Sequence, residues 1–275
     1  MASQAREESE ERPLRPNIYT IANFAQQAED GAQMIPGAGS FDEEDAFMKA
    51  IRKRDLKEVL HLRKTLSFDS LDQLGFNGEP NICAAANIED PAIIKAVLML
   101  EGPNGDATPV PPGISCSAID TQGRNALHIA AKFGHIAVVK ELFKLCPTYR
   151  HKLFGLYDHH NDTPISLAIR RGYVEVVRLI LDEIPDDHII IRNGNSRNPE
   201  SSILIDAITA HRPTIQTRLE MVHLIMQKPG TDPNKEYGAP DDEKHTAVQV
   251  AAELGNPEII QALKAEVPKA SELLH

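Results

Sequence analysis

Two consecutive segments of this chain are near copies of each other. Residues 120–143 have the sequence D-T-Q-G-R-N-A-L-H-I-A-A-K-F-G-H-I-A-V-V-K-E-L-F, and residues 158–181 have D-H-H-N-D-T-P-I-S-L-A-I-R-R-G-Y-V-E-V-V-R-L-I-L. Gly134 and Gly172 occupy the same place in the two copies and lie 38 residues apart. Repetition at such a period is typical of chains that stack small units into a solenoid. A solenoid offers a broad contact surface and no single deep cleft.

Each copy predicts two short helices. Asn125 and Thr163 precede an apolar run and can cap a helix with their side-chain oxygens, and Pro164 suits the first helical position. Gly134 and Gly172 can supply the positive φ that ends this first helix. The Val-Val pair that follows predicts the buried face of a second helix.

The two copies resemble the ankyrin repeat. Residues 125–128 stand where the family has Thr-Pro-Leu-His, residues 163–166 keep the Thr-Pro and replace the His by Ser, and residues 246–249 form a third, weaker copy. The resemblance implies an all-α, mainly helical ankyrin-repeat solenoid with short β-hairpin loops. In the family this His ties neighbouring repeats together by hydrogen bonding, so the resemblance implies that role for His128.

A spacing rule extends the pattern to weaker copies. A small residue ends the first helix, and the second of two apolar residues follows nine positions later. This rule predicts about six repeats, with helix pairs near residues 45–65, 79–100, 124–146, 162–184, 201–228 and 245–266. From Ala207 to Val222 the interval is 15 residues, so we expect six extra residues around 212–217 to lengthen the turn between the two helices.

Charge separates the N-terminal segment from the repeats. The chain carries a net charge of −11, and residues 1–45 hold three Arg against ten Asp and Glu. Few large apolar side chains accompany them, so we expect residues 1–41 to form a disordered acidic tail. Residues 42–270 are then the repeat domain, and residues 271–275 a short C-terminal tail. Residues 101–117 and 230–244 are expected to be irregular insertions.

Three cysteines, Cys83, Cys116 and Cys146, are too few and too scattered to predict a disulfide framework. We interpret Cys83 and Cys146 as buried small hydrophobes in a reducing compartment. No apolar run approaches the roughly 18 residues that a membrane span needs. We therefore expect a cytoplasmic protein, or one in a host cytosol if it is a bacterial effector.

Motifs for chemistry are missing from the sequence. It contains no G-x-x-x-x-G-K-S/T, no G-x-S-x-G and no H-E-x-x-H. The best metal candidate combines His151, residues 158–160 and residues 186–188, which the repeat register places in exposed loops. We predict no catalytic residues, no metal and no cofactor. The acidic composition also disfavours nucleic acid as a partner.

The preferred hypothesis is a non-catalytic adaptor or scaffold, a monomeric module that binds a partner protein through its concave face. The partner is expected to be acidic with an apolar anchor, because Phe133 lies among cations in the central repeats; the alternative for Phe133 is packing under the neighbouring hairpin. Candidate contacts lie at hairpin tips and first-helix ends: Arg52, Lys53, Thr121, Gln122, Arg124, Lys132, Phe133, His159, His160, Asp162, Arg170, Arg171, Asp242, Glu243, His245, Glu253 and Leu254. The alternatives are an ankyrin-type effector of an intracellular bacterium that acts on host proteins, and an enzyme whose activity lies in the insertions.

Overall fold

The protein is described by a computed structural model. Its described residues are 46–65, 79–101, 107–109, 116, 118–147, 153, 156–184, 192–195, 198–229, 231–235 and 245–271. The predicted acidic tail, residues 1–41, lies outside this part of the chain, as do most of the two predicted insertions and the candidate contacts Asp242 and Glu243.

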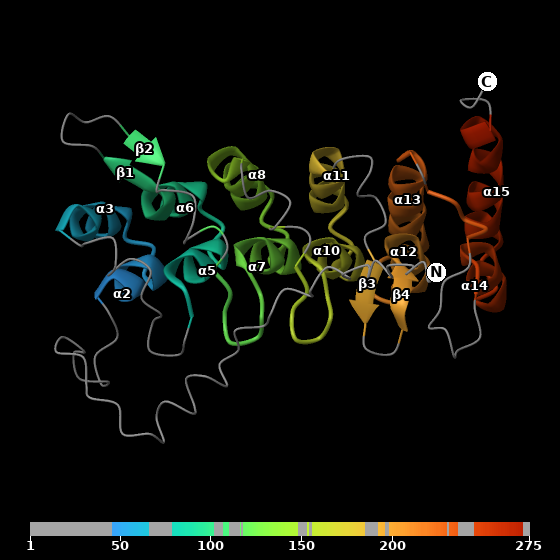
Figure 1. The fold of residues 1–275 in the computed structure, drawn as a ribbon, viewed down its shortest axis with the longest axis horizontal. Helices are drawn as coiled ribbons and strands as arrows, with labels where there is room; N and C mark the ends of the chain where they lie inside the picture. The colour runs from blue at the N-terminus through green and yellow to red at the C-terminus, as the bar shows by residue number, and fades with distance from the viewer. Residues whose placement is uncertain are drawn as a thin grey trace, which may run out of the picture. The chain divides into compact units, whose positions relative to one another are not determined.

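Within the described residues, twelve helices form six consecutive pairs, here called repeats one to six (Figure 1). Their bounds, pair by pair, are α2 Ala46–Arg52 and α3 Leu56–Thr65; α5 Asn81–Ala86 and α6 Pro91–Leu98; α7 Ala126–Phe133 and α8 Ile136–Leu145; α10 Pro164–Arg171 and α11 Val174–Glu183; α12 Ile203–Thr209 and α13 Ile215–Met226; α14 Ala247–Glu253 and α15 Pro257–Ser271.

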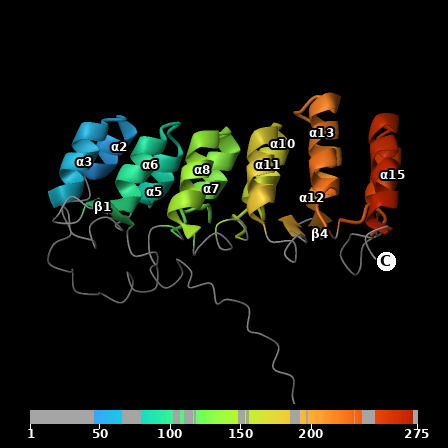
Figure 2. The same ribbon diagram turned by 90° about the horizontal axis from the view of Figure 1, so that it is seen from above.

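The helices lie in two layers. Each first helix packs against the first helix of the next repeat, from α2 through α5, α7, α10 and α12 to α14. The second helices, from α3 to α15, pack in the same order. Figure 2 shows the pairs standing side by side in chain order. This mainly helical, two-layered stack confirms the predicted fold class.

Two short antiparallel hairpins lie between repeats. Strands β1 (Met99–Glu101) and β2 (Ala107–Pro109) follow α6, with Met99 opposite Pro109. Strands β3 (Arg192–Asn195) and β4 (Asn198–Ser202) lead directly into α12. The hairpins therefore extend the loops between repeats and leave the helical layers intact.

Small and β-branched residues form the core between the layers. Ala130 and Ala168, in the first helices of repeats three and four, are fully buried. The predicted second-helix stripe is buried as well, with Val138 and Val139 in α8 as examples. Alanine lets the first helices approach closely, and valine fills the remaining space between the layers.

The predicted caps and turns are present. Asn125, Thr163 and Thr246 accept a backbone N–H bond from the third helical residue. Gly134 and Gly172 end their helices with φ of 75° and 80°, the left-handed conformation that glycine adopts at low cost.

The turn of repeat five differs from its prediction. It spans five residues, 210–214, where repeat three has only the two residues 134–135. Residues 215–217, expected in the turn, form the first turn of α13, because Thr214 caps that helix by accepting from the backbone N–H of Thr217. The extra residues thus lengthen both the turn and the helix.

The cysteine interpretation was half wrong. Cys83 is buried and free, and its thiol lies 3.6 Å from the Arg124 carbonyl oxygen and 3.8 Å from that of Ala118. Cys146, however, forms a disulfide with Cys116. The fold brings the segment ahead of the third repeat against the end of α8, a proximity that the separation of 30 residues does not reveal. This bond is more typical of an oxidising compartment than of the reducing one that was expected.

No helix in the described part of the chain is both long enough and apolar enough to cross a membrane.

Candidate functional site

The loops ahead of α7 and α10 form two similar fingers. Each finger takes the number of its repeat. The third finger is residues 119–124, and the fourth finger is residues 157–162. Asp120 Oδ1 accepts the backbone N–H groups of Gln122 at 2.8 Å and Arg124 at 2.9 Å. Asp158 Oδ1 makes the equivalent two bonds in the fourth finger. One aspartate therefore holds each finger in a tight turn.

Neighbouring fingers are joined to each other. The backbone N–H of His159 donates to the carbonyl oxygen of Gln122 at 2.8 Å. The His159 ring also lies over Gly123, where an added Cβ would be 2.8 Å from its Cδ2. His159 is exposed, as the candidate site requires, but its position is set by the preceding repeat.

His128 joins the same two repeats from inside. Its side chain is fully buried, and Nε2 lies 3.1 Å from the carbonyl oxygen of Asp162. Nδ1 lies 3.2 Å from the backbone N of Asn125 and 2.8 Å from Asn125 Oδ1, so both ring nitrogens have polar partners. Burial lowers the pKa of His128 to about 4. A neutral histidine in this place confirms the expected structural tie between repeats.

Ion pairs neutralise much of the predicted basic groove. Arg124 donates from Nε and Nη2 to Asp120 at 2.8 and 2.6 Å, and Arg170 pairs with Asp162. Burial raises the pKa of the Asp162 carboxyl, and the hydrogen bond and charge of Arg170 oppose that effect. The sequence prediction treated both arginines as free positive charges, whereas each is paired with an aspartate of a finger.

The ends of the candidate site are also paired. Arg52 lies 3.0 Å from Glu79, and His245 Nδ1 lies 3.5 Å from Glu253. Arg52 and Lys53 belong to repeat one, whereas His245, Glu253 and Leu254 belong to repeat six. Four first helices separate these groups in the packing order (Figure 1). The predicted residues therefore do not form one compact patch.

The central part of the site is exposed. Phe133 has 45% of its surface accessible, so it does not pack under the neighbouring finger. The Lys132 ammonium lies 5.9 Å from its ring centroid, and His135 stacks on it at the same centroid distance. Arg171 occupies the equivalent place in repeat four and is exposed too.

Two apolar finger residues were missed. Ile119 and Tyr157 immediately precede Asp120 and Asp158, and they are 49% and 42% exposed. They lie 38 residues apart, so the repeat register would have found them as one variable position. With Thr121, Gln122, His159 and His160, which are all exposed, they give the fingers a mixed apolar and polar surface.

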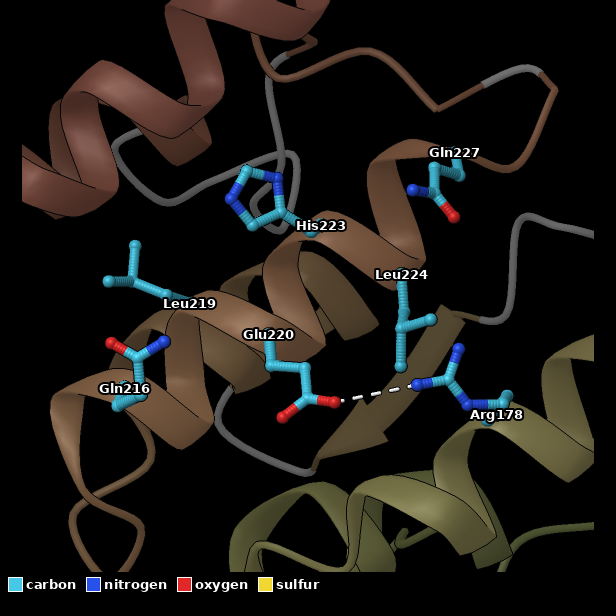
Figure 3. Close-up of a pocket in the computed structure, with 7 residues that line it drawn as sticks. All are labelled: Arg178, Gln216, Leu219, Glu220, His223, Leu224 and Gln227. Atoms are coloured by element: carbon cyan, nitrogen blue, oxygen red, sulfur yellow. Dashed lines mark hydrogen bonds and ion pairs between the residues drawn. The ribbon is translucent and has the colours of Figure 1, made fainter.

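A separate groove of about 350 Å³ lies between the second helices α11 and α13, as Figure 3 shows. Arg178 reaches across it to Glu220 at 3.4 Å, and Leu219 and Leu224 provide the apolar part of its lining. It is in the other helix layer from the candidate contacts. In the described residues no group of three or more His, Cys, Asp or Glu side chains is placed to hold a metal ion.

Residues 82–193 match the family model described as ankyrin repeats in three copies. This segment consists of ankyrin repeats. The match covers repeats two to four, which include both fingers and the His128 tie. No curated protein sequence matches the chain.

Solved ankyrin-repeat structures share the fold beyond that segment. The ankyrin repeat domain of Bcl-3, a member of the IkappaB family, is 18% identical over 82% of this chain and 87% of its own, with a TM-score of 0.64. The ankyrin repeat protein EF0377 is 19% identical over 81% and 98%, with a TM-score of 0.61. A domain from Acinetobacter baumannii AYE is 16% identical over 80% and 96%, also with a TM-score of 0.61. At these identities the likeness concerns the fold.

Proposed function

We propose that this chain is a non-catalytic adaptor that binds a partner protein through the fingers and the exposed ends of its first helices. Ankyrin repeats generally serve as protein-interaction modules. The observation that carries the proposal is the recurrence of exposed side chains at equivalent positions. Ile119 and Tyr157 form one such pair, and Phe133 and Arg171 form another.

The arrangement suits a protein partner better than a small molecule. Aspartates, inter-finger hydrogen bonds and the His128 tie fix the fingers in place, so little conformational entropy is lost on binding. Exposed aromatic and aliphatic side chains then supply the anchors that dominate protein interfaces. The partner is expected to carry acidic residues around an apolar anchor, because Lys132 adjoins Phe133 and Arg171 occupies the equivalent position in the next repeat.

The test first captures one stoichiometric partner from a lysate with the parent chain. The Kd of that partner is then measured for the parent chain and for each variant. Phe133→Ala should weaken binding by about 2 kcal/mol or more, the usual size of a hot spot. Arg171→Glu should slow association, and more so at low salt. Arg170→Glu is unsuitable, because it would leave the buried Asp162 carboxylate beside a second acid.

Lys264→Ala, at an exposed position of α15, serves as the control. Unchanged affinity for Phe133→Ala and Arg171→Glu would place the partner elsewhere. Turnover of a substrate by the purified chain alone would favour the enzymatic alternative. A monomeric state and a cytoplasmic location stay predictions, and the Cys116–Cys146 bond argues against the second of them.

A further inference from the structure

The turns between the paired helices of repeats three, four and five form one continuous surface. Tyr173 lies against the preceding turn, where a Cβ added to Gly134 would be 2.7 Å from its ring. Pro213 lies in the same way against Gly172, whose added Cβ would be 3.1 Å from Pro213 Cγ. We call this surface, made of residues 132–136, 171–174 and 212–215, the turn ridge.

The turn ridge is positive in an acidic protein. Its three segments contain no Asp or Glu, although the chain as a whole has a net charge of −11. Lys132, Arg171 and Arg212 have no carboxylate partner among the residues that the structure describes. The adjacent Glu175, in α11, lies 3.5 Å from Arg178 of the same helix, which offsets its charge. Three uncompensated cations therefore lie along this edge.

Apolar side chains separate these cations. Phe133, Ile136 and Ile215 are 45%, 38% and 37% exposed, and they rank among the exposed large hydrophobic residues of the protein. Tyr173 and Pro213 are half-buried between them. An apolar strip bordered by unpaired cations is the composition expected where a surface meets an acidic, partly apolar partner.

We propose that the turn ridge binds an acidic segment of a partner protein. The carboxylates of that segment pair with the three cations, and its apolar side chains cover the three exposed hydrophobic ones. The inference rests on the proposed function, because Lys132, Phe133 and Arg171 belong to both surfaces. It extends the contact past the fingers and the first helices, over the turns and onto repeat five.

Two other classes of partner fit the ridge less well. Surfaces that bind anionic lipid typically carry a cluster of about 4–8 Lys and Arg residues. The turn ridge has three. A membrane also takes up apolar groups that protrude, whereas more than half of each apolar side chain here is already covered. Duplex DNA binding typically uses about 6–10 phosphate contacts. Three cations beside a half-covered apolar strip match a short protein segment.

The proposal is tested with a fluorescein-labelled peptide that repeats Glu-Asp-Leu-Ser-Phe, with fluorescence anisotropy as the measurement. The ridge variant combines Lys132→Glu, Arg171→Glu and Arg212→Glu. The matched control makes the same change of net charge at exposed lysines of the second-helix layer, with Lys57→Glu, Lys95→Glu and Lys140→Glu. Circular dichroism verifies that both variants keep the helical content of the parent chain.

We expect the ridge variant to lose about tenfold or more in affinity for this peptide, and the control to stay within about twofold. Replacing Leu and Phe of the peptide by Ser should weaken binding to the parent chain. The double variant Ile136→Ser and Ile215→Ser, which changes no finger residue, should weaken it as well.

Equal loss in the ridge variant and in its control would reduce the effect to general charge attraction and overturn the proposal. Binding to phosphatidylserine vesicles without binding to the peptide would replace the protein segment by a membrane. A finger variant with Ile119→Ser and Tyr157→Ser separates the two surfaces. If it loses the peptide while the ridge variant keeps it, the proposed function stands and the turn ridge is not the site.

Discussion

At the scale of single residues, His128 combines structural and electrostatic roles. Its buried ring is within hydrogen-bond distance of Asn125 and of the Asp162 carbonyl oxygen, and burial lowers its pKa to about 4 from the ordinary 6.5. Because the folded protein disfavours the protonated form, the stability contribution of the neutral ring is complete above about pH 6.5. It is lost as the pH falls from there toward 4.

The first prediction follows from that shift. The free energy of unfolding should fall by on the order of 3 kcal/mol between pH 6.5 and pH 4 through this residue, at 1.36 kcal/mol per pKa unit. Urea unfolding at several pH values measures it. His128→Gln removes the titration and should flatten this part of the profile, although it lowers stability at pH 7. An unchanged slope in the variant would assign the acid sensitivity to other groups.

The second prediction compares two glycines with the same backbone conformation. Gly134 and Gly255 have φ of 75° and 66°, but only Gly134 has a neighbour within reach of an added Cβ, the ring of Tyr173. Gly255→Ala should cost about 1 kcal/mol through backbone strain alone. Gly134→Ala should cost at least about 1 kcal/mol more, because packing must also shift. Chemical denaturation of both variants measures the difference.

A double variant identifies the source of the extra cost. Adding Tyr173→Ala to Gly134→Ala should recover part of it, because the obstructing ring is gone. If the two glycine variants are equally destabilised, the Tyr173 contact does not constrain the turn.

At the scale of elements, local chemistry determined what the sequence could predict. Helix caps at Asn125 and Thr163, and the glycines that end α7 and α10, act within a few residues and were predicted correctly. The spacing rule predicted that residues 212–217 lengthen the turn. In the structure part of them lengthens the helix instead, because Thr214 caps α13 and the spacing rule takes no account of caps.

Contacts across the fingers and between helices were not predictable in the same way. Arg124 and Arg170 look like free cations in the sequence, and only the geometry of the finger shows that Asp120 and Asp162 neutralise them. Ile119 and Tyr157 were overlooked because the motif comparison began at the following aspartate. The 38-residue repeat register places them at equivalent positions, but the compared motif does not include those positions.

The third prediction concerns the element that closes repeat three. The Cys116–Cys146 bond encloses a loop with a sequence separation of 30 residues. The chain-entropy account assigns such a loop about 3.6 kcal/mol of stabilisation. Cys116→Ser should lower the free energy of unfolding by about that amount, and a dithiol reductant should do the same to the parent chain. Cys83→Ser, at the free cysteine, should stay sensitive to the reductant. No effect of reductant on the parent chain would contradict the role of this bond.

At the scale of the whole molecule, stability should vary along the stack. Repeats three and four have the finger bonds, the His128 tie and fully buried second-helix stripes. In α14 of repeat six, only Ala247 and Ala251 are buried. Each repeat contacts only its neighbours, so terminal repeats open more readily than central ones.

The fourth prediction is therefore a gradient in hydrogen exchange. Backbone amides of α7, α8, α10 and α11 should exchange most slowly, and those of α14 and α15 much faster. Native-state exchange followed by mass spectrometry measures this directly. The slowest amides found in repeat one or repeat six would contradict a stack that is most stable at its centre.

The turn contacts have a consequence for how such a chain can change over generations. Tyr173 fits because the preceding turn offers a glycine, and Pro213 fits for the same reason one repeat later. Repeat three ends its turn with His135, where repeat four has Tyr173, so the units are not interchangeable. A unit whose turn lacks this glycine, placed ahead of repeat four or five, would set a side chain against Tyr173 or Pro213. These junctions thus restrict which units can precede repeats four and five.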